Sequence, residues 1–318
     1  MTAAEQGLVV VTGGCGFIGG HLVRRLSQMG RSVRVLDDLS NGDLGRLPAG
    51  VDFREGDVAD PAAVLSAVTG ATVVFHLAAV ASVQVSNKRW LDSHLTNSGG
   101  AVAVMEALRN ESPNAAFVYA SSAAVYGDVP LIGDERITEK ARCVPLAPYG
   151  IDKLATEWHA GVGGTLFGLR SFGLRFFNVF GPGQAPDSPY SGVISRFVAQ
   201  AGSGGPITIF GDGEQTRDFV HIDDVVSALL LAESAASTAA PVANICTGLT
   251  TSVNELANVI AGQFKPAPPL VCTAGRIGDI RRSVGDPTLA WKLLGWRSAV
   301  SLGDGLADLV KSEASEAR

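Results

Sequence analysis

Short apolar runs alternate with helical stretches from residue 8 to about residue 178. The runs that predict strands are Leu8–Thr12, Val33–Asp37, Val51–Glu55, Val73–Leu77, Phe117–Ser121 and Phe172–Asn178. Helical patterns follow Gly16, Pro61, Asn97 and Pro148. This alternation is typical of βαβ units, whose right-handed crossovers build a doubly wound parallel sheet. We therefore expect an α/β fold with a ligand crevice beyond the carboxyl ends of the strands.

The chain becomes rich in loops after Asn178, where Gly and Pro gather in FGPGQAPDSPYSG and AGSGGPITIFGDGEQ. Such clusters predict turns and irregular structure. The later run HIDDVVSALLLAE predicts a helix that returns to the sheet. We therefore expect a sheet domain over residues 1–178, with a returning segment near 219–244. A smaller, loop-rich α/β lobe that binds the substrate is expected over 179–218 and 245–318.

Composition and charge exclude several classes of protein. Apolar residues make up 46% of the 318 residues and charged residues 18%, which is ordinary for a globular protein. The formal charge of -6 argues against nucleic acid and anionic membrane surfaces as partners, because both attract clustered positive charge. No run approaches the roughly 20 apolar residues of a membrane span and no leader pattern precedes the first strand, so we expect a cytoplasmic protein. The four cysteines lack ligand spacing, so no metal site is expected.

Three glycines follow the first predicted strand in LVVVTGGCGFIGGHL. Gly13, Gly16 and Gly19 give the spacing G-x-x-G-x-x-G between a strand and a helix. Without side chains the backbone turns tightly and can approach a pyrophosphate, which the free N–H groups and the dipole of the helix N-terminus favour. A glycine turn of purely structural use is the alternative. Asp37 at the end of the second strand favours a dinucleotide site, because this combination is the Rossmann fingerprint.

Acidic residues near the second and third strands indicate which dinucleotide binds. The Asp37 carboxylate can accept hydrogen bonds from the adenosine ribose hydroxyls and repels a 2'-phosphate, and Asp38 adds to the negative field. NAD is therefore expected rather than NADP. Asp57, after the third strand, either meets the adenine ring or caps the next helix.

The segment PYGIDK combines a tyrosine and a lysine at helical spacing. Tyr149 and Lys153 stand at i and i+4, which puts both side chains on one face of a helix. A tyrosine with a pKa of about 10 is a poor base at neutral pH, and a nearby ammonium favours its phenolate. The same spacing also arises by chance in structural helices. Here, however, Ser122 ends the preceding strand at the edge where a nicotinamide lies, so Ser122 and Tyr149 are expected to hold and deprotonate the reacting hydroxyl.

Seven motifs, in this order, resemble the extended short-chain dehydrogenase/reductase family, specifically its NAD-dependent sugar epimerases and dehydratases. They are TGGCGFIGGHLV, HLAA, ASSAAVYG, PYGIDK, LRFFNVFGPGQ, GDGEQTRDFVHIDDV and RIGDIRRSVGD. The resemblance covers nearly the whole chain. It implies a Rossmann-type domain that binds NAD, a UDP-sugar as substrate and a homodimer as the assembled form.

The resemblance also implies roles for individual residues. Ser122, Tyr149 and Lys153 match the catalytic residues of the family. The residues that match its cofactor contacts are Gly13, Gly16, Phe17, Ile18, Gly19, Asp37, Asp38, Asp57, Val58, Leu77, Ala78, Ala79, Asn97, Tyr149 and Lys153. Those that match its nucleotide-sugar contacts are Ser122, Asn178, Val193, Thr208, Phe210, Arg217, Arg276 and Asp279. The arginines suit this role, since a guanidinium pairs with two phosphate oxygens at once.

The two residues after Ser122 bear on the reaction. Dehydratases of the family resemble one another in carrying Asp and Glu there, and the related decarboxylases carry Glu at the second position. This chain has Ala123 and Ala124, which transfer no protons. The resemblance therefore favours the 4-epimerases that act on UDP-glucose and UDP-galactose. In such enzymes NAD oxidises C4 of the sugar to a ketone and then returns the hydride to its other face.

Two further positions bear on the sugar. Ala185 stands where family members that act on UDP-glucuronate carry arginine, so a neutral hexose is expected. Ser283 matches a position that is bulky in glucose-type enzymes, and a small residue there leaves room for a 2-acetamido group. The N-acetylhexosamine pair is therefore expected to be accepted as well. Two alternatives stay open: another nucleotide-sugar enzyme of this fold (a UDP-glucuronate epimerase, a dehydratase or a keto-sugar reductase), and a non-catalytic NAD-binding sensor.

Two features depart from the family pattern. Asp152 replaces the serine that commonly precedes the lysine, and it either points to solvent or raises the pKa of Tyr149. Gly161, Gly163 and Gly164 each cost the helix about 1 kcal/mol relative to alanine. In dimers of the family this helix and the one after Asn97 form the interface, so the glycines weigh against the usual dimer.

Overall fold

The central element of the fold is a sheet of seven parallel strands. The computed structural model describes residues 7–184, 192–275 and 280–316. Across the sheet the strand order is β11, β6, β5, β4, β1, β2, β3, and every neighbouring pair is parallel. The strands are β1 Leu8–Thr12, β2 Ser32–Asp37, β3 Asp52–Glu55, β4 Ala71–His76, β5 Ala116–Ser122, β6 Arg170–Phe176 and β11 Val242–Ile245. The predicted doubly wound, Rossmann-type α/β fold is confirmed.

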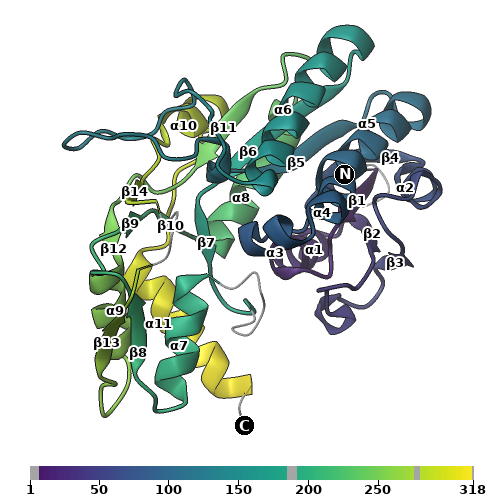
Figure 1. Cartoon of the computed structure of the whole chain (residues 1–318). Coiled ribbons are helices and arrows are strands. Elements are labelled where there is room, and N and C mark those ends of the chain that lie inside the picture. The colour runs from purple at the N-terminus through teal and green to yellow at the C-terminus, as the bar shows by residue number, and fades with distance from the viewer. Residues whose placement is uncertain (1–6, 185–191, 276–279, 317–318) are drawn as a thin grey trace.

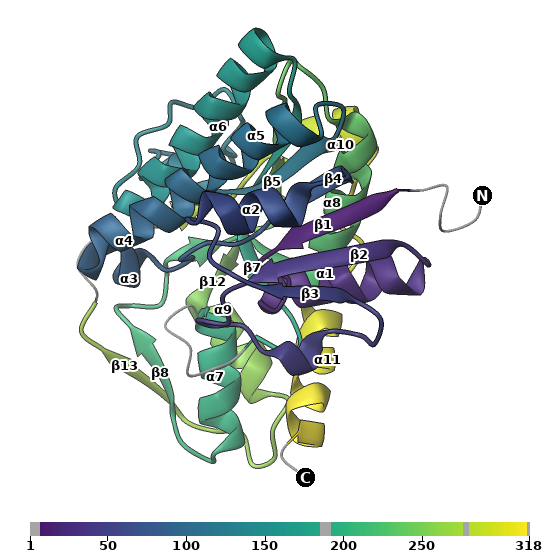
Figure 2. The same cartoon turned by 90° about the vertical axis from the view of Figure 1, so that its right-hand side faces the viewer.

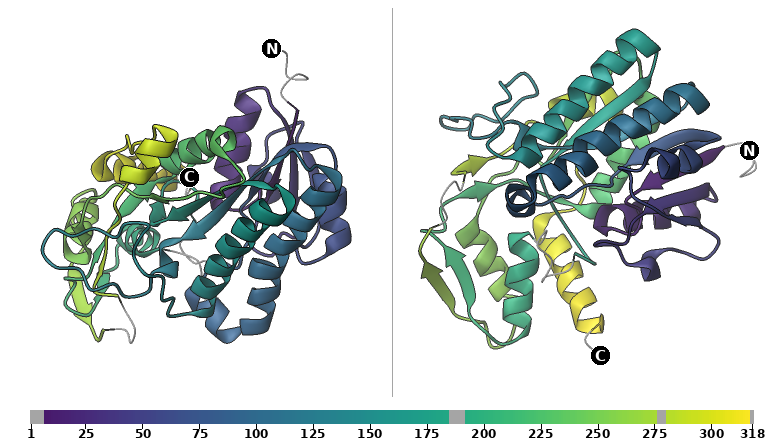
Figure 3. Two further views of the ribbon diagram at one scale, coloured as in Figure 1. Left: turned by 90° about the horizontal axis from the view of Figure 1, so that it is seen from above. Right: turned by 45° about the vertical axis from the view of Figure 1, so that its right-hand side comes forward.

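Helices cover both faces of the sheet, so its strands are buried on both sides. The helices are α1 Phe17–Gln28, α2 Pro61–Val68, α5 Gly100–Glu111, α6 Pro148–Phe167 and α8 Ile222–Ala235. Along β1, Val9 and Val11 pack into one core with α1 and α8, while Val10 packs into the opposite core with α2 and α5. Each of these fully buried valines contributes about 1.5 kcal/mol or more by leaving water. Figure 2 shows the helix layers on either side of the strands, and in Figure 3 α5 and α6 run side by side.

The last strand predicted before the loop-rich region is two strands in the structure. β6 ends at Phe176, and the N–H of Phe177 still donates to Ile245 of β11. Asn178 instead donates to the carbonyl of Asp218, and β7 Asn178–Phe180 pairs in parallel with β10 Phe219–His221. The prediction of one strand ending at Asn178 is therefore wrong, because the chain changes its hydrogen-bond partner at that residue.

The helix predicted after Asn97 begins before that residue. α3 Val83–Lys88 and α4 Trp90–His94 are followed by a π-helical turn, Leu95–Gly99, which continues directly into α5. Asn97 therefore lies inside a helical stretch and is buried. Single π-turns are frequent at functional sites because they re-aim one side chain without ending the helix.

A smaller unit with its own core lies beside the sheet, at the lower left of Figure 1. Its larger elements are α7 Val193–Gly202, β8 Ile207–Phe210, α9 Val253–Ala261, β13 Leu270–Thr273 and α11 Leu302–Glu316. Its shorter strands are β9 Thr216–Arg217, β12 Thr251–Ser252 and β14 Arg282–Ser283. Ile194, Phe197, Ile209, Leu256 and Leu306 are among the buried side chains that join these elements.

One element of the C-terminal part packs on the larger unit. α10 Thr288–Leu294 contacts α8 and β11, and the indole N–H of Trp296 donates to the carbonyl of Asp224 at 2.9 Å. The division of the chain into residues 1–178, 219–244 and the remaining segments stays a prediction. In the described part of the chain, no helix combines the length and the apolar character needed to cross a membrane.

Candidate active site

The glycine turn lies between β1 and α1, as the sequence predicts. Gly13 has a φ of +70°, and a Cβ there would lie 2.6 Å from the backbone nitrogen of Ala78. A Cβ at Gly19 would overlap the Gly13 carbonyl. Gly16 caps α1 without a side-chain acceptor, which leaves the first N–H groups of the helix for an anionic ligand. Phe17 and Ile18 form the first turn of this helix.

Asp37 is the last residue of β2 and is buried beside this turn. Its two oxygens accept hydrogen bonds from the backbone N–H groups of Cys15 and Leu39, each at 2.9 Å. Burial raises the pKa of Asp37, and these two hydrogen bonds act in the opposite direction. Since an ionised carboxylate offers about four acceptor positions, about two remain for ribose hydroxyls. The neighbouring Asp38 is exposed and accepts from the N–H and hydroxyl of Ser40.

The residues after β3 form a local turn. The Asp57 carboxylate accepts from the N–H of Ala59 at 2.8 Å, whereas Asp60 caps α2. The interpretation of Asp57 as the helix cap is therefore wrong. Val58 is buried and packs against Gly100, where a Cβ would lie 2.7 Å from the valine side chain.

Asn97 fixes the loop that follows β4. Its side-chain oxygen accepts from the N–H of Val80 at 2.7 Å, and its amide nitrogen donates to the Val80 carbonyl at 3.3 Å. Leu77 and Ala78 of the same loop donate to the backbone and the hydroxyl of Thr12, at the end of β1. The HLAA loop, including Ala79, is thus held next to the glycine turn by contacts from two directions.

Ser122, Tyr149 and Lys153 come together beyond the carboxyl end of β5. Ser122 is the last residue of that strand, and its hydroxyl oxygen accepts from the N–H of Ala124 at 3.1 Å. Ser122 lies close enough to Tyr149, the second residue of α6, to lower the pKa of its phenol. The Nζ atom of the buried Lys153 lies 5.8 Å from the centre of the Tyr149 ring. The structure therefore brings a hydroxyl, a phenol and an ammonium group to one edge of the sheet.

Burial shifts both titrating groups of this trio toward their neutral forms. It raises the pKa of Tyr149 to about 12, against the effect of the Ser122 hydrogen bond, and lowers the pKa of Lys153 to about 8, against the charge of Asp152. The sequence predicts that Lys153 lowers the pKa of Tyr149. In the structure the pKa of Tyr149 is raised instead, because desolvation has the larger effect. Burial and the Lys153 charge also lower the pKa of His76 to about 3, so this histidine is neutral at ordinary pH.

Asp152 does not point to solvent. Its side chain is buried, with the residue only 1% exposed, and its Oδ1 atom lies 2.7 Å from Nδ1 of His94 on α4. Asp152 raises the pKa of Lys153. Of the two alternatives for Asp152, exposure to solvent is wrong, because α4 packs against this part of α6 and brings His94 within hydrogen-bond distance.

The sequence analysis did not predict a buried ion pair that lies behind Ser122. Arg175 of β6 donates from Nε and Nη2 to the two carboxylate oxygens of Glu157 on α6, at 2.8 and 2.6 Å. The Ser121 hydroxyl donates to the same carboxylate, and Arg175 also donates to the hydroxyl of Tyr126. Glu157 lies one turn beyond Lys153, so this network fixes the catalytic helix to β5 and β6. The i+8 spacing from Tyr149 is the signal that sequence reasoning left unused.

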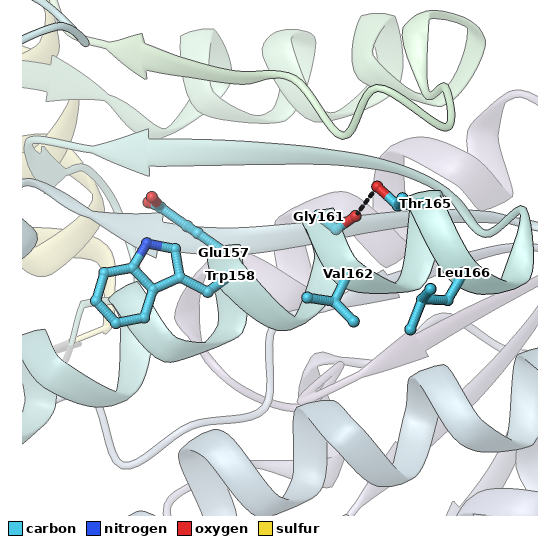
Figure 4. A pocket seen from close by; sticks show the side chains of 6 residues that line it. All are labelled: Glu157, Trp158, Gly161, Val162, Thr165 and Leu166. Carbon is cyan, nitrogen blue, oxygen red and sulfur yellow. Dashed lines mark hydrogen bonds between the residues drawn. The ribbon is translucent and has the colours of Figure 1, made fainter.

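The glycines of α6 do not interrupt the helix, which continues to Phe167. A Cβ at Gly164 would overlap the carbonyl oxygen of Thr238, so this position needs the smallest residue for close packing. Gly161 faces open space and lines a groove of about 550 Å³ with Trp158, Val162 and Leu166. Figure 4 shows Val162 and Leu166 pointing away from the strands, on the side opposite to the Glu157 carboxylate.

The predicted nucleotide-sugar contacts lie on the smaller unit and at its junction with the sheet. Asn178 begins β7, Val193 begins α7, and Thr208 and Phe210 belong to β8. Arg217 of β9 donates to the carbonyls of Thr216 and Ile280 and pairs with Ser283 of β14. The predicted positions that lie outside the described residues are Ala185, Arg276 and Asp279.

A polar pocket of about 410 Å³ next to the glycine turn was also missed. His21 donates from Nε2 to the carbonyl of Pro182 at 2.9 Å. Arg46, at the end of the short 3-10 helix Leu44–Arg46, donates to the carbonyl of Gly183 at 2.8 Å. These contacts join the first βα unit to the segment after β7. Because the contacting residues lie far apart in sequence, no local sequence pattern predicts the pocket.

The fold and the site define a dinucleotide-dependent enzyme of the Rossmann class, in which a serine, a tyrosine and a lysine meet at the carboxyl edge of the sheet. Residues 9–246 match the model of the NAD dependent epimerase/dehydratase family. Because this match spans most of the chain, the protein belongs to that family.

Relatives of known name are similar over nearly the whole chain. The UDP-glucose 4-epimerase of Mycolicibacterium smegmatis is 35% identical over 312 residues, which cover 95% of this chain and 97% of the relative. The crystal structure of UDP-glucose 4-epimerase from Thermotoga maritima with UDP-glucose has a TM-score of 0.92 at 34% identity, covering 98% and 100% of the two chains. The UDP-N-acetylglucosamine 4-epimerase of Methanobrevibacter ruminantium, in complex with UDP-N-acetylmuramic acid, has a TM-score of 0.90 at 30% identity, with coverage of 98% and 99%.

Proposed function

We propose that this protein is an NAD-dependent 4-epimerase of UDP-hexoses that acts on UDP-glucose and UDP-galactose. The observation that carries the proposal is the meeting of Ser122, Tyr149 and the buried Lys153 beyond the carboxyl end of β5. Full-length similarity to proteins named UDP-glucose 4-epimerase supports it. The presence of both Tyr149 and Lys153 argues against a non-catalytic sensor, which needs neither group.

NAD is the cofactor of the family to which the chain belongs, and the residues at the site fit it. The Gly13 and Gly19 positions leave no room for a Cβ, which is the condition for a tight turn under a pyrophosphate. The Asp37 carboxylate keeps acceptor capacity for two ribose hydroxyls and disfavours a 2'-phosphate. We assign the cofactor contacts to this turn, to the loop held by Asn97, and to Tyr149 and Lys153.

The chemistry follows from the three side chains at the end of β5. When bound, NAD would supply the acceptor and then the donor for the C4 hydride of the sugar. Tyr149 removes the proton of the C4 hydroxyl, and Ser122 donates a hydrogen bond to that oxygen. Since burial alone raises the pKa of Tyr149 to about 12, the phenolate needs the nearby charge of Lys153. The result is a 4-keto sugar that is reduced on either face.

The smaller unit holds the nucleotide part of the substrate in this proposal. Phe210 ends β8 with a partly exposed ring, which offers a flat apolar surface for the base, and Thr208 precedes it on the same strand. Arg217 supplies a guanidinium for the diphosphate. We assign Asn178, Val193, Arg276 and Asp279 to the same binding site on the family resemblance.

The residues around Ser122 favour epimerisation over dehydration. Ala123 and Ala124 form the first residues of the short 3-10 helix Ala123–Val125 directly after the strand. Neither side chain can transfer a proton, and the loss of a C6 hydroxyl requires a second acid and base. The dehydratase alternative therefore lacks its chemical groups at the positions where the family carries them.

We also propose that UDP-N-acetylglucosamine and its C4 epimer are substrates. Ser283, the small residue at the position that is bulky in glucose-type enzymes, stands on β14 beside Arg217. Similarity to an enzyme named UDP-N-acetylglucosamine 4-epimerase supports this extension. Turnover of UDP-galactose without turnover of either acetylated sugar would contradict it.

The decisive experiment is NMR of UDP-galactose, UDP-N-acetylgalactosamine and UDP-galacturonate after incubation with the purified enzyme. We expect the C4 epimer of the first two and none of the third, with NAD recovered unchanged after many turnovers. The Tyr149→Phe enzyme should form product at least about a hundredfold more slowly, the lower range for loss of a general base. Wild-type turnover by this variant would refute the assigned base, and net consumption of NAD would favour a reductase or dehydrogenase.

We propose that the outer side of α6 is the interface of a homodimer. Trp158 and Leu166 are each 67% exposed, and Val162 is half-exposed between them. Trp90 and Leu91 of the neighbouring α4 are equally exposed. An apolar strip of this size is unusual on a monomer, and a two-fold axis across it lets the same residues cover one another.

The oligomeric state tests this interface directly. Val162→Arg should convert the dimer to a monomer in sedimentation or light-scattering measurements. Leu249→Arg replaces an equally exposed leucine outside this strip and should leave the dimer intact. A monomeric wild-type protein at micromolar concentration would contradict the proposal.

We propose that the protein works in the cytoplasm. Cys15, Cys143, Cys246 and Cys272 are all free thiols, which suits a reducing compartment. Fractionation of cells that produce the tagged protein would test the location, and recovery from an oxidising compartment would contradict it.

A further inference from the structure

Asp152 is a buried carboxylate directly next to the catalytic lysine. Its Oδ1 atom accepts a hydrogen bond from Nδ1 of His94 at 2.7 Å. Its Oδ2 atom is buried and forms no hydrogen bond with the residues that the structure describes. A charge withdrawn from water is costly unless it is compensated. Here His94 donates a hydrogen bond to the carboxylate, and the carboxylate interacts electrostatically with the ammonium group of Lys153, the next residue of α6.

His94 connects two elements that build the site. It is the last residue of α4 and precedes the π-turn that contains Asn97, the residue that fixes the loop after β4. Asp152 belongs to α6, three residues after Tyr149. One hydrogen bond therefore joins the cofactor side of the site to the helix that carries the base.

The titratable groups that interact with Lys153 come from two elements. On α6 these are Tyr149 and Asp152, and on β4 the group is His76. His76 is neutral at ordinary pH because its pKa is about 3. On α4, the charged neighbours of His94 are Arg89 and Asp92, which pair with each other at the surface. Asp152 is thus the group whose negative charge opposes the effect of burial on the lysine.

We propose that Asp152 and His94 form a positioning pair that keeps Lys153 protonated next to Tyr149. Asp152 supplies the charge, and His94 holds the carboxylate in place from α4. Asp152 stands at the position where the family commonly has a serine. This inference rests on the catalytic roles proposed above, and it adds residues that touch neither substrate nor cofactor.

The test is the pH profile of kcat for the NAD-loaded enzyme with UDP-galactose. Asp152→Asn keeps the shape and the acceptor oxygen but removes the charge, so Lys153 loses its proton more easily. We expect the alkaline limb of the profile to move to lower pH by about one unit, the lower range for the loss of an adjacent opposite charge. Asp92→Asn, which neutralises an exposed carboxylate on α4, should leave the limb in place.

His94 variants separate positioning from a general loss of structure. His94→Ala leaves the buried carboxylate without its donor and should move the limb in the same direction as Asp152→Asn. His94→Gln retains a donor and should restore the wild-type limb. Circular dichroism and bound NAD at each pH establish that the variants are folded and loaded.

Two outcomes overturn the inference, and they are distinguishable. If Tyr149→Phe is inactive but Asp152→Asn lowers kcat equally at every pH, the carboxylate is only structural and this inference fails alone. If Tyr149→Phe turns over at the wild-type rate, the proposed catalytic roles fail and the positioning pair fails with them.

Discussion

The ion pair between Glu157 and Arg175 should be the most costly single interaction to break in the catalytic helix. Arg175→Met keeps an unbranched apolar stem but removes two hydrogen bonds to Glu157 and one to Tyr126. Both side chains of the pair are less than a tenth exposed. Removing one partner of a buried pair leaves the other charge uncompensated, so we expect the free energy of unfolding to fall by about 3–5 kcal/mol.

The double variant Glu157→Leu with Arg175→Met tests the physical reason. It removes the stranded carboxylate, so it should be more stable than Arg175→Met alone, although Ser121 then loses its acceptor and Tyr126 keeps only its bond to Asn244. Urea unfolding of the NAD-loaded protein, followed by circular dichroism, gives the midpoint and slope for each protein. Arg89→Met, which breaks an exposed pair with Asp92, is the control and should change little.

The reasoning is refuted if Arg175→Met costs less than about 1 kcal/mol, the range of surface ion pairs. A double variant no more stable than Arg175→Met would also contradict it, because the penalty would then not come from the stranded charge. The same proteins report on catalysis. Since Glu157 is two turns from Tyr149 on α6, a shifted helix should lower kcat more than it raises KM.

Three shorter predictions concern packing, pH and chemistry. Gly164→Ala should lower the melting temperature, because the added Cβ would overlap the Thr238 carbonyl. Gly161→Ala adds a Cβ in open space, so in the monomeric Val162→Arg protein it should leave the melting temperature unchanged or raise it. The pKa of His76 falls from 6.5 to about 3 on folding, so the free energy of unfolding should decline by up to about 1.4 kcal/mol per pH unit as the pH drops through this window; His76→Gln should flatten that decline in acid-unfolding curves. Ser122→Ala should lower kcat for UDP-galactose about a hundredfold or more in steady-state assays, and an unchanged kcat would remove Ser122 from the mechanism.

The parts of the site that the sequence predicts are those built by local chain geometry. The glycine turn, Asp37 at the end of β2, and Tyr149 with Lys153 one turn apart are each specified within a single strand–turn–helix unit or helix. Strand periodicity and the glycines suffice to predict that these units form a doubly wound parallel sheet. Ser122 follows because β5 ends at the same edge as β1.

The parts that the sequence does not predict depend on which surfaces meet. The carboxylates of Asp152 and Glu157 look alike in sequence, and each could face solvent on a helix. Only the packing of α4 and β6 against α6 decides that one meets His94 and the other Arg175. Asn97 is a similar case, because the π-turn that aims it at Val80 has no sequence signal comparable to a cap or a proline.

The catalytic helix α6 combines these observations in one element. Tyr149, Lys153 and Glu157 recur every four residues on its inner side, while Val162 and Leu166 lie on the side that points away from the strands. The inner side fixes the helix to β5 and β6 at its middle, and the proposed dimer would cover the outer side. A small rotation of the helix would therefore move the phenol away from Ser122 and tilt the outer strip at the same time. The catalytic geometry and the oligomeric state are for this reason expected to depend on each other.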